Sequence, residues 1–249
     1  HFFGWESRRV YNKPDRILIT SRMFREYLVQ QHGVDDTKIA YLPQYAATQF
    51  DTMPPSDPDK KTVDLMFAGN VGAAQSLITV LQAAELLRQE TQLRWHIVGD
   101  GSELQHLQKQ AAEKQLDCVI FHGRKPPEEM PRYYAMADAM IVTLTADRFI
   151  SLTLPGKVQS YMAAGKPMIG SANGEIPLVI AEAQCGYCAP AEDSQGLAEA
   201  VRQFLDCPDR AKLGRNARTY YEKHFTREHF MNVLERELYA CAGQGEQPK

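Results

Sequence analysis

A glycine and a lysine open a predicted helix in the segment TLPGKVQSYMAAGKPMIG, residues 153–170. The apolar residues of this helix recur at the spacing of one face, and Pro167 stops it before a short apolar strand. The first turn of a helix has unpaired N–H groups and the positive end of the helix dipole, so it can bind an anion. Lys157 lies in that turn, where a cation is disfavoured by up to about 1 kcal/mol. This mismatch suggests that Gly156 and Lys157 serve an anionic ligand; a solvated surface lysine is the alternative.

Three further glycine-rich turns each follow an apolar segment that has the length of a strand. They lie at residues 69–72, 99–101 and 123–125. The strands are predicted at residues 63–68, 93–98, 118–122 and 139–144, with a fifth that includes 168–169. Helical patterns alternate with them, which is typical of an α/β fold with a doubly wound parallel sheet, Rossmann-like, covered by helices on both faces. Ligands of such sheets bind beyond the carboxyl ends of the strands, so we predict a site for a phosphate-bearing ligand at that edge.

The glycines match neither of the two common nucleotide-binding motifs. Gly69 and Gly72 lack the third glycine of the dinucleotide fingerprint, and so does the turn at 99–101. Lys166 follows Gly165, but a proline comes next and no upstream glycine has the P-loop spacing. A hydride-transferring dehydrogenase and a P-loop nucleotidase are therefore disfavoured. A site of backbone N–H groups and a few cations remains, which suits a nucleoside diphosphate.

Composition excludes several other classes. The chain has 249 residues, 44% hydrophobic and 24% charged, so it can bury a large core. Its net charge of −3 and the absence of basic runs disfavour nucleic-acid binding. It has neither an apolar run long enough for a transmembrane helix nor a secretory signal at its start, where Met is absent.

Five cysteines, an odd number in apolar contexts, suit free thiols in a reducing cytoplasm. Cys185 and Cys188 have CxxC spacing, but no second ligand pair accompanies them. We therefore expect structural cysteines and no metal site.

The pattern along the chain predicts four segments. Residues 1–45 hold a short strand, a helix and another short strand, and residues 46–62, rich in proline and aspartate, read as a linker. Residues 63–240 contain the alternating strands and helices and end in further amphipathic helices. Residues 241–249 are expected to be a disordered tail.

Several ordered motifs together resemble one family. They are FAGNVGAAQ at 67–75, IVGDGSE at 97–103, FHGRKPPEEMPRYYAMADAMIVTL at 121–144, LPGKVQSYMAAGKPMI at 154–169 and EAQCGYCAP at 182–190. They are similar to the C-terminal, donor-binding domain of family-4-like (group 1) retaining glycosyltransferases of the GT-B fold. Bacterial enzymes that build O-antigen and capsule, such as L-fucosamine transferases, share the similarity. Residues 6–45 resemble the end of the N-terminal acceptor domain and its crossover.

The resemblance implies a role for each predicted site residue. The loop from Gly69 to Gln75 would face the diphosphate, and Arg124 would lie at the nucleobase. The N–H groups after Gly156 would bind phosphate, and Lys157 would be the catalytic cation that neutralises the leaving group. The predicted donor-binding residues are Gly69, Asn70, Gly72, Gln75, Asp100, Arg124, Lys125, Thr153, Gly156 and Ser160. The family usually uses no metal, and we expect neither a metal nor a cofactor.

The sequence departs from the commoner family pattern at and just before the helix that begins with Gly156 and Lys157. That pattern has two glutamates, the second of which holds the ribose, where this chain has Leu152 and Ser160. A subgroup with a proline, small residue, lysine motif shows similar replacements, so altered donor recognition is the favoured interpretation. Glu175 and Glu182 are substitute candidates for the ribose contact.

We therefore expect the donor-binding part of an enzyme that transfers a sugar, with retention, from a nucleoside diphosphate sugar, by resemblance UDP-linked. The acceptor would be a polysaccharide or lipid-linked saccharide held by an acceptor domain outside this chain, so the chain alone is expected to have little activity. A non-catalytic nucleotide-sugar-binding module and a sugar-nucleotide epimerase remain alternatives. The expected location is the cytoplasm, with peripheral attachment to the inner membrane through the missing domain as a further possibility.

Overall fold

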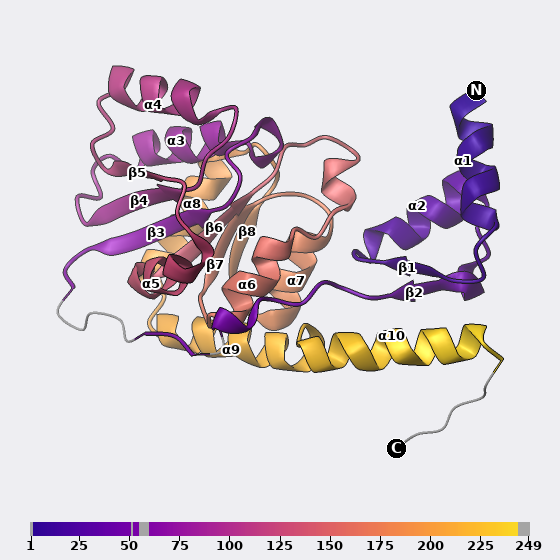
Figure 1. Ribbon diagram of the computed structural model, residues 1–249. Helices are drawn as coiled ribbons and strands as arrows, with labels where there is room; N and C mark the ends of the chain where they lie inside the picture. The colour runs from indigo at the N-terminus through magenta and orange to yellow at the C-terminus, as the bar shows by residue number, and fades with distance from the viewer. Residues whose placement is uncertain (1, 51, 55–59, 244–249) are drawn as a thin grey trace.

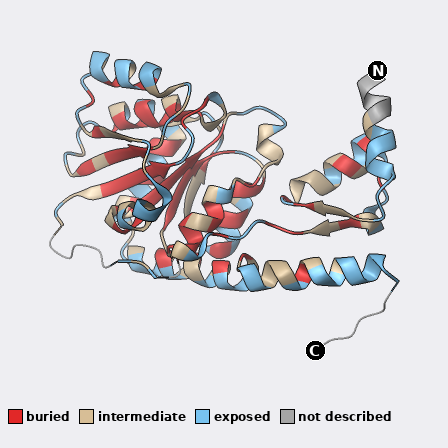
Figure 2. Cartoon of the chain, viewed as in Figure 1, coloured by how far each residue is buried: buried red, intermediate tan, exposed pale blue. Residues whose placement is uncertain are grey.

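The computed structural model describes residues 2–50, 52–54 and 60–243. A parallel sheet of six strands, in the order β5-β4-β3-β6-β7-β8, forms its centre (Figure 1). The strands are β3 (Val63–Ala68), β4 (Leu93–Val98), β5 (Val119–Gly123), β6 (Ala139–Thr143), β7 (Met168–Ser171) and β8 (Gly186–Ala189). Burial on both faces explains why the central strands are almost continuous apolar runs (Figure 2).

Helices cover both faces of this sheet. One face packs on α3 (Leu77–Leu86), α4 (Leu104–Glu113) and α8 (Ser194–Asp206). The other packs on α5 (Met130–Met136), α6 (Gly156–Ala163), α7 (Glu175–Ala183) and α9 (Arg210–His224). The predicted doubly wound α/β architecture is confirmed.

The strand order creates one switch point. The chain builds outward from β3 to β5 and then returns to place β6 on the other side of β3. The loops that follow β3 and β6 therefore diverge, and a crevice at the carboxyl ends of these two strands is where ligands of this fold bind.

The N-terminal residues form a smaller unit. It contains α1 (Phe2–Asn12), β1 (Ile17–Ile19), α2 (Met23–His32) and β2 (Ile39–Tyr41), with β1 and β2 paired in parallel. The long last helix α10 (Arg227–Cys241) runs back alongside this unit (Figure 1), where Glu237 Oε2 lies 3.3 Å from Arg16 Nε. None of the helices in the described ranges is both long and apolar enough to cross a bilayer.

Two parts of the structure differ from the predicted segments. The sheet has a sixth strand, β8, which contains Cys188 of the CxxC motif and was not predicted. The segment predicted as a linker includes Phe50, whose buried ring stacks on Tyr134 at 4.7 Å between centroids. Residues 51 and 55–59 of that segment lie outside the described residues, as do 244–249 of the predicted tail; the division into domains stays a prediction.

Candidate functional site

A hollow of about 700 Å³ lies at the carboxyl ends of β3, β4 and β5. The loops after these strands and the start of α5 line it, and five of the predicted donor-binding residues are among the lining residues. These are Gly69, Asn70, Asp100, Arg124 and Lys125. The fold thus brings together, at one edge of the sheet, residues that the sequence predicted on three separate loops.

The first two glycine turns touch one another across this edge. Gly69 N donates to Val98 O at 2.9 Å, and Val71 N donates to Asp100 O at 2.9 Å. A Cβ atom on Gly99 would lie 1.8 Å from Gly69 O, and its φ of +143° is also unfavourable for other residues. Only glycine at position 99 allows the two backbones to approach this closely.

The loop after β3 is held by its own side chains. Gln75 Oε1 accepts hydrogen bonds from Gly72 N at 3.2 Å and from Asn70 Nδ2 at 3.4 Å. Gln75 and Asn70 therefore shape the loop in this structure, and their direct contact with a donor stays a prediction.

Lys157 reaches this edge from the first turn of α6, which follows β6. Its Nζ atom lies 3.8 Å from the centroid of the Phe67 ring, and a Cβ on Gly69 would lie 3.1 Å from it. The ammonium is buried and has no hydrogen-bond partner within the part of the chain that the structure describes. Burial lowers the pKa of Lys157 to about 7. A lysine amino group without a hydrogen-bond partner among the described residues therefore lies at the switch point between β3 and β6, where an anion would stabilise its charged form.

The other predicted residues near α6 have local partners. Thr153 Oγ1 donates to Ile150 O at 2.7 Å, and Ser160 Oγ donates to Gly156 O at 3.3 Å. Both hydroxyl oxygens can still accept a hydrogen bond. Gln44, from the segment after β2, was not predicted: its Oε1 atom lies 2.9 Å from the position that a Cβ on Gly156 would take. No local pattern in the sequence marks it.

The suggestion that Glu175 contacts the ribose was wrong. The Glu175 side chain is fully buried, and its carboxylate accepts from Arg22 N at 2.6 Å, from Arg22 Nε at 2.7 Å and from Tyr41 OH at 3.2 Å. Glu182 accepts from Arg22 Nη1 at 2.8 Å and from Tyr220 OH at 2.7 Å. Both carboxylates thus bind the N-terminal unit to α7 and are occupied there.

The third glycine turn completes the hollow. Gly123 has a φ of +66°, and its carbonyl accepts from Gly99 N at 2.9 Å, which ties this turn to the second one. Arg124 is exposed beside it, and Lys125 Nζ lies 5.8 Å from the centroid of the Tyr133 ring. Two basic side chains therefore flank the part of the hollow that was predicted for the nucleobase. Among the described residues, no group of three or more His, Cys, Asp or Glu side chains could hold a metal ion.

Comparisons with known proteins agree with this geometry. WbjE of Pseudomonas aeruginosa, named as a glycosyltransferase, is 25% identical over 87% of this chain and 56% of its own length. WcaI of Escherichia coli K12, named for colanic acid biosynthesis, is 29% identical over 71% of this chain and 42% of its own. The chain thus spans about half the length of these relatives.

A solved structure shows the same fold. Anabaena Alr3699/HepE, crystallised with UDP, superimposes with a TM-score of 0.78 at 15% identity over 95% of this chain and 66% of its own. The model of the family "Glycosyl transferases group 1" matches residues 49–220, which is most of the chain and includes the hollow. The resemblance predicted from the motifs is confirmed at this level, and the chain belongs to the group 1 glycosyltransferase family.

Proposed function

We propose that this chain is the donor-binding half of a retaining glycosyltransferase that uses a nucleoside diphosphate sugar, with UDP as the nucleotide. The buried, unpartnered ammonium of Lys157 carries this proposal. It lies beside Gly69, next to the N-terminal turn of α6 and at the switch point of the sheet. A diphosphate placed there would satisfy Lys157 and the N–H groups of the helix together.

The same groups suit the chemical step. When the bond from the sugar to the diphosphate breaks, negative charge grows on the leaving phosphate oxygens. Lys157 and the first N–H groups of α6 would stabilise that charge in place, without rearrangement. Arg124 and Lys125 would contact the nucleobase. In this proposal, no metal takes part.

The names of related proteins support UDP and a saccharide acceptor. HepE has been crystallised with UDP-glucose as well as with UDP. A Salmonella typhimurium relative, 24% identical over 69% of this chain, is named as a lipopolysaccharide N-acetylglucosaminetransferase. We propose a polysaccharide or lipid-linked acceptor, held by the domain that would precede this chain, and peripheral contact with the membrane through that domain.

One observation favours a non-catalytic donor-binding module as the second candidate. Leu152 and Ser160 replace the carboxylates of the commoner family pattern, and Glu175, the candidate substitute, is occupied by Arg22 and Tyr41. An epimerase has less support. By the resemblance, residues 147–153 would face the transferred sugar, and Asp147 is the one acid among them. Its Oδ1 atom accepts hydrogen bonds from two backbone N–H groups of that loop.

Calorimetric titration of the chain with UDP, GDP, ADP and NAD tests donor binding. We expect one nucleoside diphosphate, UDP, to bind and NAD not to bind. Lys157→Ala should weaken UDP binding about 10- to 100-fold, because a charged hydrogen bond contributes about 1.5–3 kcal/mol. Lys109→Ala, an exposed lysine of α4, is the control. Binding that is unchanged in Lys157→Ala would contradict the site.

The second experiment separates a transferase from a module. The full-length protein is assayed with UDP-sugars and a lipid-linked saccharide acceptor, with and without EDTA. Product that needs the donor, that survives EDTA and that disappears in Lys157→Ala supports metal-free transfer. Tight UDP binding without product in the full-length protein would instead support the module.

A further inference from the structure

His122 occupies an irregular position next to the third glycine turn. Along the β4–β5 ladder Ile97 pairs with Phe121, but the next residue of β4, Val98, pairs with Gly123. His122 is therefore the extra residue of a β-bulge, a feature that often lies beside functional sites and redirects the chain. Because of the bulge, the Gly123 carbonyl meets Gly99 N, and the second and third turns are held together at the hollow.

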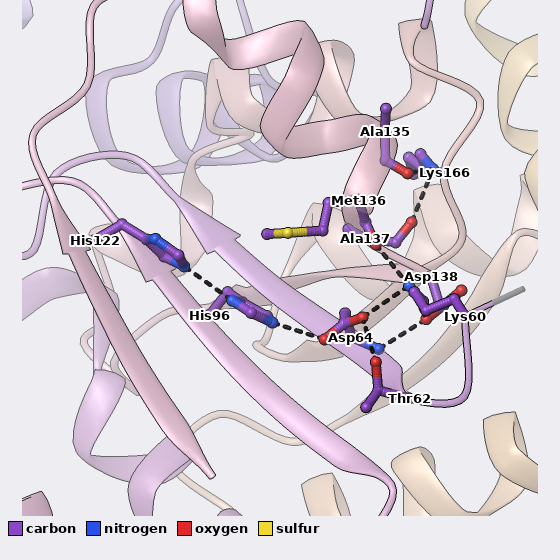
Figure 3. Close-up of polar contacts among 10 residues, drawn as sticks. All are labelled: Lys60, Thr62, Asp64, His96, His122, Ala135, Met136, Ala137, Asp138 and Lys166. Atoms are coloured by element: carbon purple, nitrogen blue, oxygen red, sulfur yellow. Dashed lines mark hydrogen bonds and ion pairs between the residues drawn. The ribbon is translucent and has the colours of Figure 1, made fainter. Parts of the chain in front are cut away.

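The side chain of His122 points toward His96, in a line of polar groups that continues to Asp64 (Figure 3). His122 Nε2 lies 2.8 Å from His96 Nδ1, and His96 Nε2 lies 2.7 Å from Asp64 Oδ1. His96 and Asp64 are buried, on β4 and β3 respectively. The line therefore crosses three adjacent strands and ends at the bulge.

The far end of this line is fixed by further contacts. Asp64 Oδ2 accepts from Lys60 Nζ at 2.8 Å and from Thr62 Oγ1 at 2.9 Å, and Lys60 also contacts Asp138 (Figure 3). Burial alone would raise the pKa of Asp64, but the hydrogen bonds from His96 and Lys60 outweigh it and hold that pKa well below its usual range. Asp64 is thus a charged acceptor, and His96 must donate its Nε2 proton to it.

This constraint determines the hydrogen bond to His122. Because a neutral His96 carries its one ring proton on Nε2 and donates it to Asp64, its Nδ1 is unprotonated. His122 must therefore donate to it from Nε2. If one proton is added to His96, its Nδ1 becomes the donor and His122 Nε2 the acceptor. The hydrogen bond is then kept in the opposite direction. With a second proton, both rings carry N–H groups at the shared contact, and the bond is lost.

We propose that His122 is a positioning residue for donor binding: its hydrogen bond to His96 holds the bulge, and thereby the Gly123 turn, in the shape that receives the nucleobase. This inference rests on the proposed function. His122 is not among the residues that line the hollow, so it acts through the turn and not by contact.

The groups around His122 keep it neutral under ordinary conditions. Burial, the neighbouring His96 and the charge of Lys125 lower the pKa of His122, while the Tyr133 ring of α5 contacts its edge at 5.2 Å between centroids. The bond to His96 is therefore intact near neutral pH. It is lost only when both rings carry a second proton.

Two variants of similar chemistry test this role. In His122→Gln, the side-chain amide nitrogen lies near the place of Nε2 and can still donate, whereas the shorter Asn side chain of His122→Asn does not reach His96. At pH 7.5 we expect His122→Asn to weaken UDP binding about fivefold, the factor for one net hydrogen bond. His122→Gln should stay within about twofold of the unchanged chain. His106→Gln, an exposed histidine of α4, is the control.

The pH profile separates positioning from simple packing. Glutamine does not titrate, so UDP binding by the unchanged chain should fall relative to His122→Gln once the pH is low enough to protonate both rings. An equal loss in the Gln and Asn variants, or a ratio that does not change with pH, would overturn the proposal. If the unchanged chain bound no nucleotide at any pH, the proposed function itself would fail, and this inference with it.

Ring ¹⁵N spectra of the unliganded chain show which nitrogen of each histidine ring carries the proton, and so test the direction of the hydrogen bond. At a pH where both rings are neutral, we expect His96 and His122 each to carry the proton on Nε2. A proton on Nδ1 of neutral His96 would overturn the proposed line of hydrogen bonds, whatever the nucleotide experiments give.

Discussion

A lysine ammonium lies at each end of strand β3, half-buried in Lys60 and buried in Lys157, and the two differ in their partners. Before the strand, Lys60 Nζ lies 2.8 Å from Asp64 Oδ2, 2.7 Å from Asp138 Oδ2 and 2.7 Å from Met136 O. Beyond its carboxyl end, Lys157 Nζ faces the Phe67 ring and has no hydrogen-bond partner in the described ranges.

The pKa values move in opposite directions as a result. Burial would lower the pKa of Lys60, but its hydrogen bonds with Asp138 and Asp64 reverse this and raise it. Burial without a partner lowers the pKa of Lys157 to about 7. Lys60 is therefore part of the folded framework, whereas Lys157 lacks the anion that would stabilise its charge. The difference indicates which lysine serves a ligand.

The largest effect on stability should come from Lys60→Met, which keeps the apolar stem and removes the charge. Breaking a largely buried ion pair leaves Asp64 without one partner, so we expect the free energy of unfolding in urea to fall by about 3–5 kcal/mol. Lys109→Met removes an exposed pair and should change it by less than about 0.5 kcal/mol. Similar losses in the two variants would contradict the structural role of Lys60.

Arg22→Ala should have the next largest effect. It leaves the fully buried carboxylate of Glu175 with Tyr41 as its one remaining side-chain partner among the described residues. We expect a loss of about 3 kcal/mol, at the lower end for a buried pair because the Arg22 side chain is partly open to solvent. Thermal unfolding measures it, and Arg22→Lys should recover part of the loss. A variant as stable as the unchanged chain would show that α7 does not depend on the N-terminal unit.

Unlike the two preceding changes, Lys157→Met should raise the free energy of unfolding. The change removes a buried ammonium that has no hydrogen-bond partner in the described part of the chain, and burying such a polar group costs about 1–3 kcal/mol. We therefore expect the unliganded chain to become more stable in urea at pH 7, by more than about 1 kcal/mol. A loss of stability in this variant would mean that Lys157 has a structural partner.

The smallest expected effect is a difference between the unchanged chain and Lys157→Met in how stability depends on pH. Because the pKa of Lys157 is about 7 in the folded chain and near its ordinary value of 10.5 in the unfolded chain, the unfolded chain binds more protons between these values. The stability contribution of this group therefore rises with pH across that window, by less than about 1.4 kcal/mol per pH unit. Urea titrations from pH 7 to 10 should show a steeper rise in the unchanged chain than in Lys157→Met. Parallel curves would contradict the lowered pKa.

The sequence predicted most of the sheet edge but not its long-range contacts. Buried parallel strands are continuous apolar runs, so five strands and the glycine turns after them could be recognised. Strand β8 is short, begins with Gly186 and is only partly buried, and it lacked such a signal. Lys157 stood out because a cation in the first turn of a helix is unfavourable by itself.

The errors and omissions concern pairs of residues far apart in the chain. Glu175 was a candidate for the ribose contact because no local pattern indicates its partner, Arg22, which lies 153 positions earlier. The bond between His96 and His122 depends on strand pairing and on a bulge, neither of which a local pattern encodes. Gln44 reaches Gly156 only through the path of the chain after β2.

The most direct test of the central claim is whether UDP brings a proton to Lys157. Calorimetric titrations at pH 8 in buffers of different ionisation enthalpy give the number of protons taken up per UDP bound. Since Lys157 is mostly neutral at pH 8 and a diphosphate would stabilise its charged form, we predict uptake approaching one proton in the unchanged chain. Lys157→Arg, which is always charged, should bind UDP without that uptake. Binding with no proton uptake in the unchanged chain, or equal uptake in Lys157→Arg, would contradict the account.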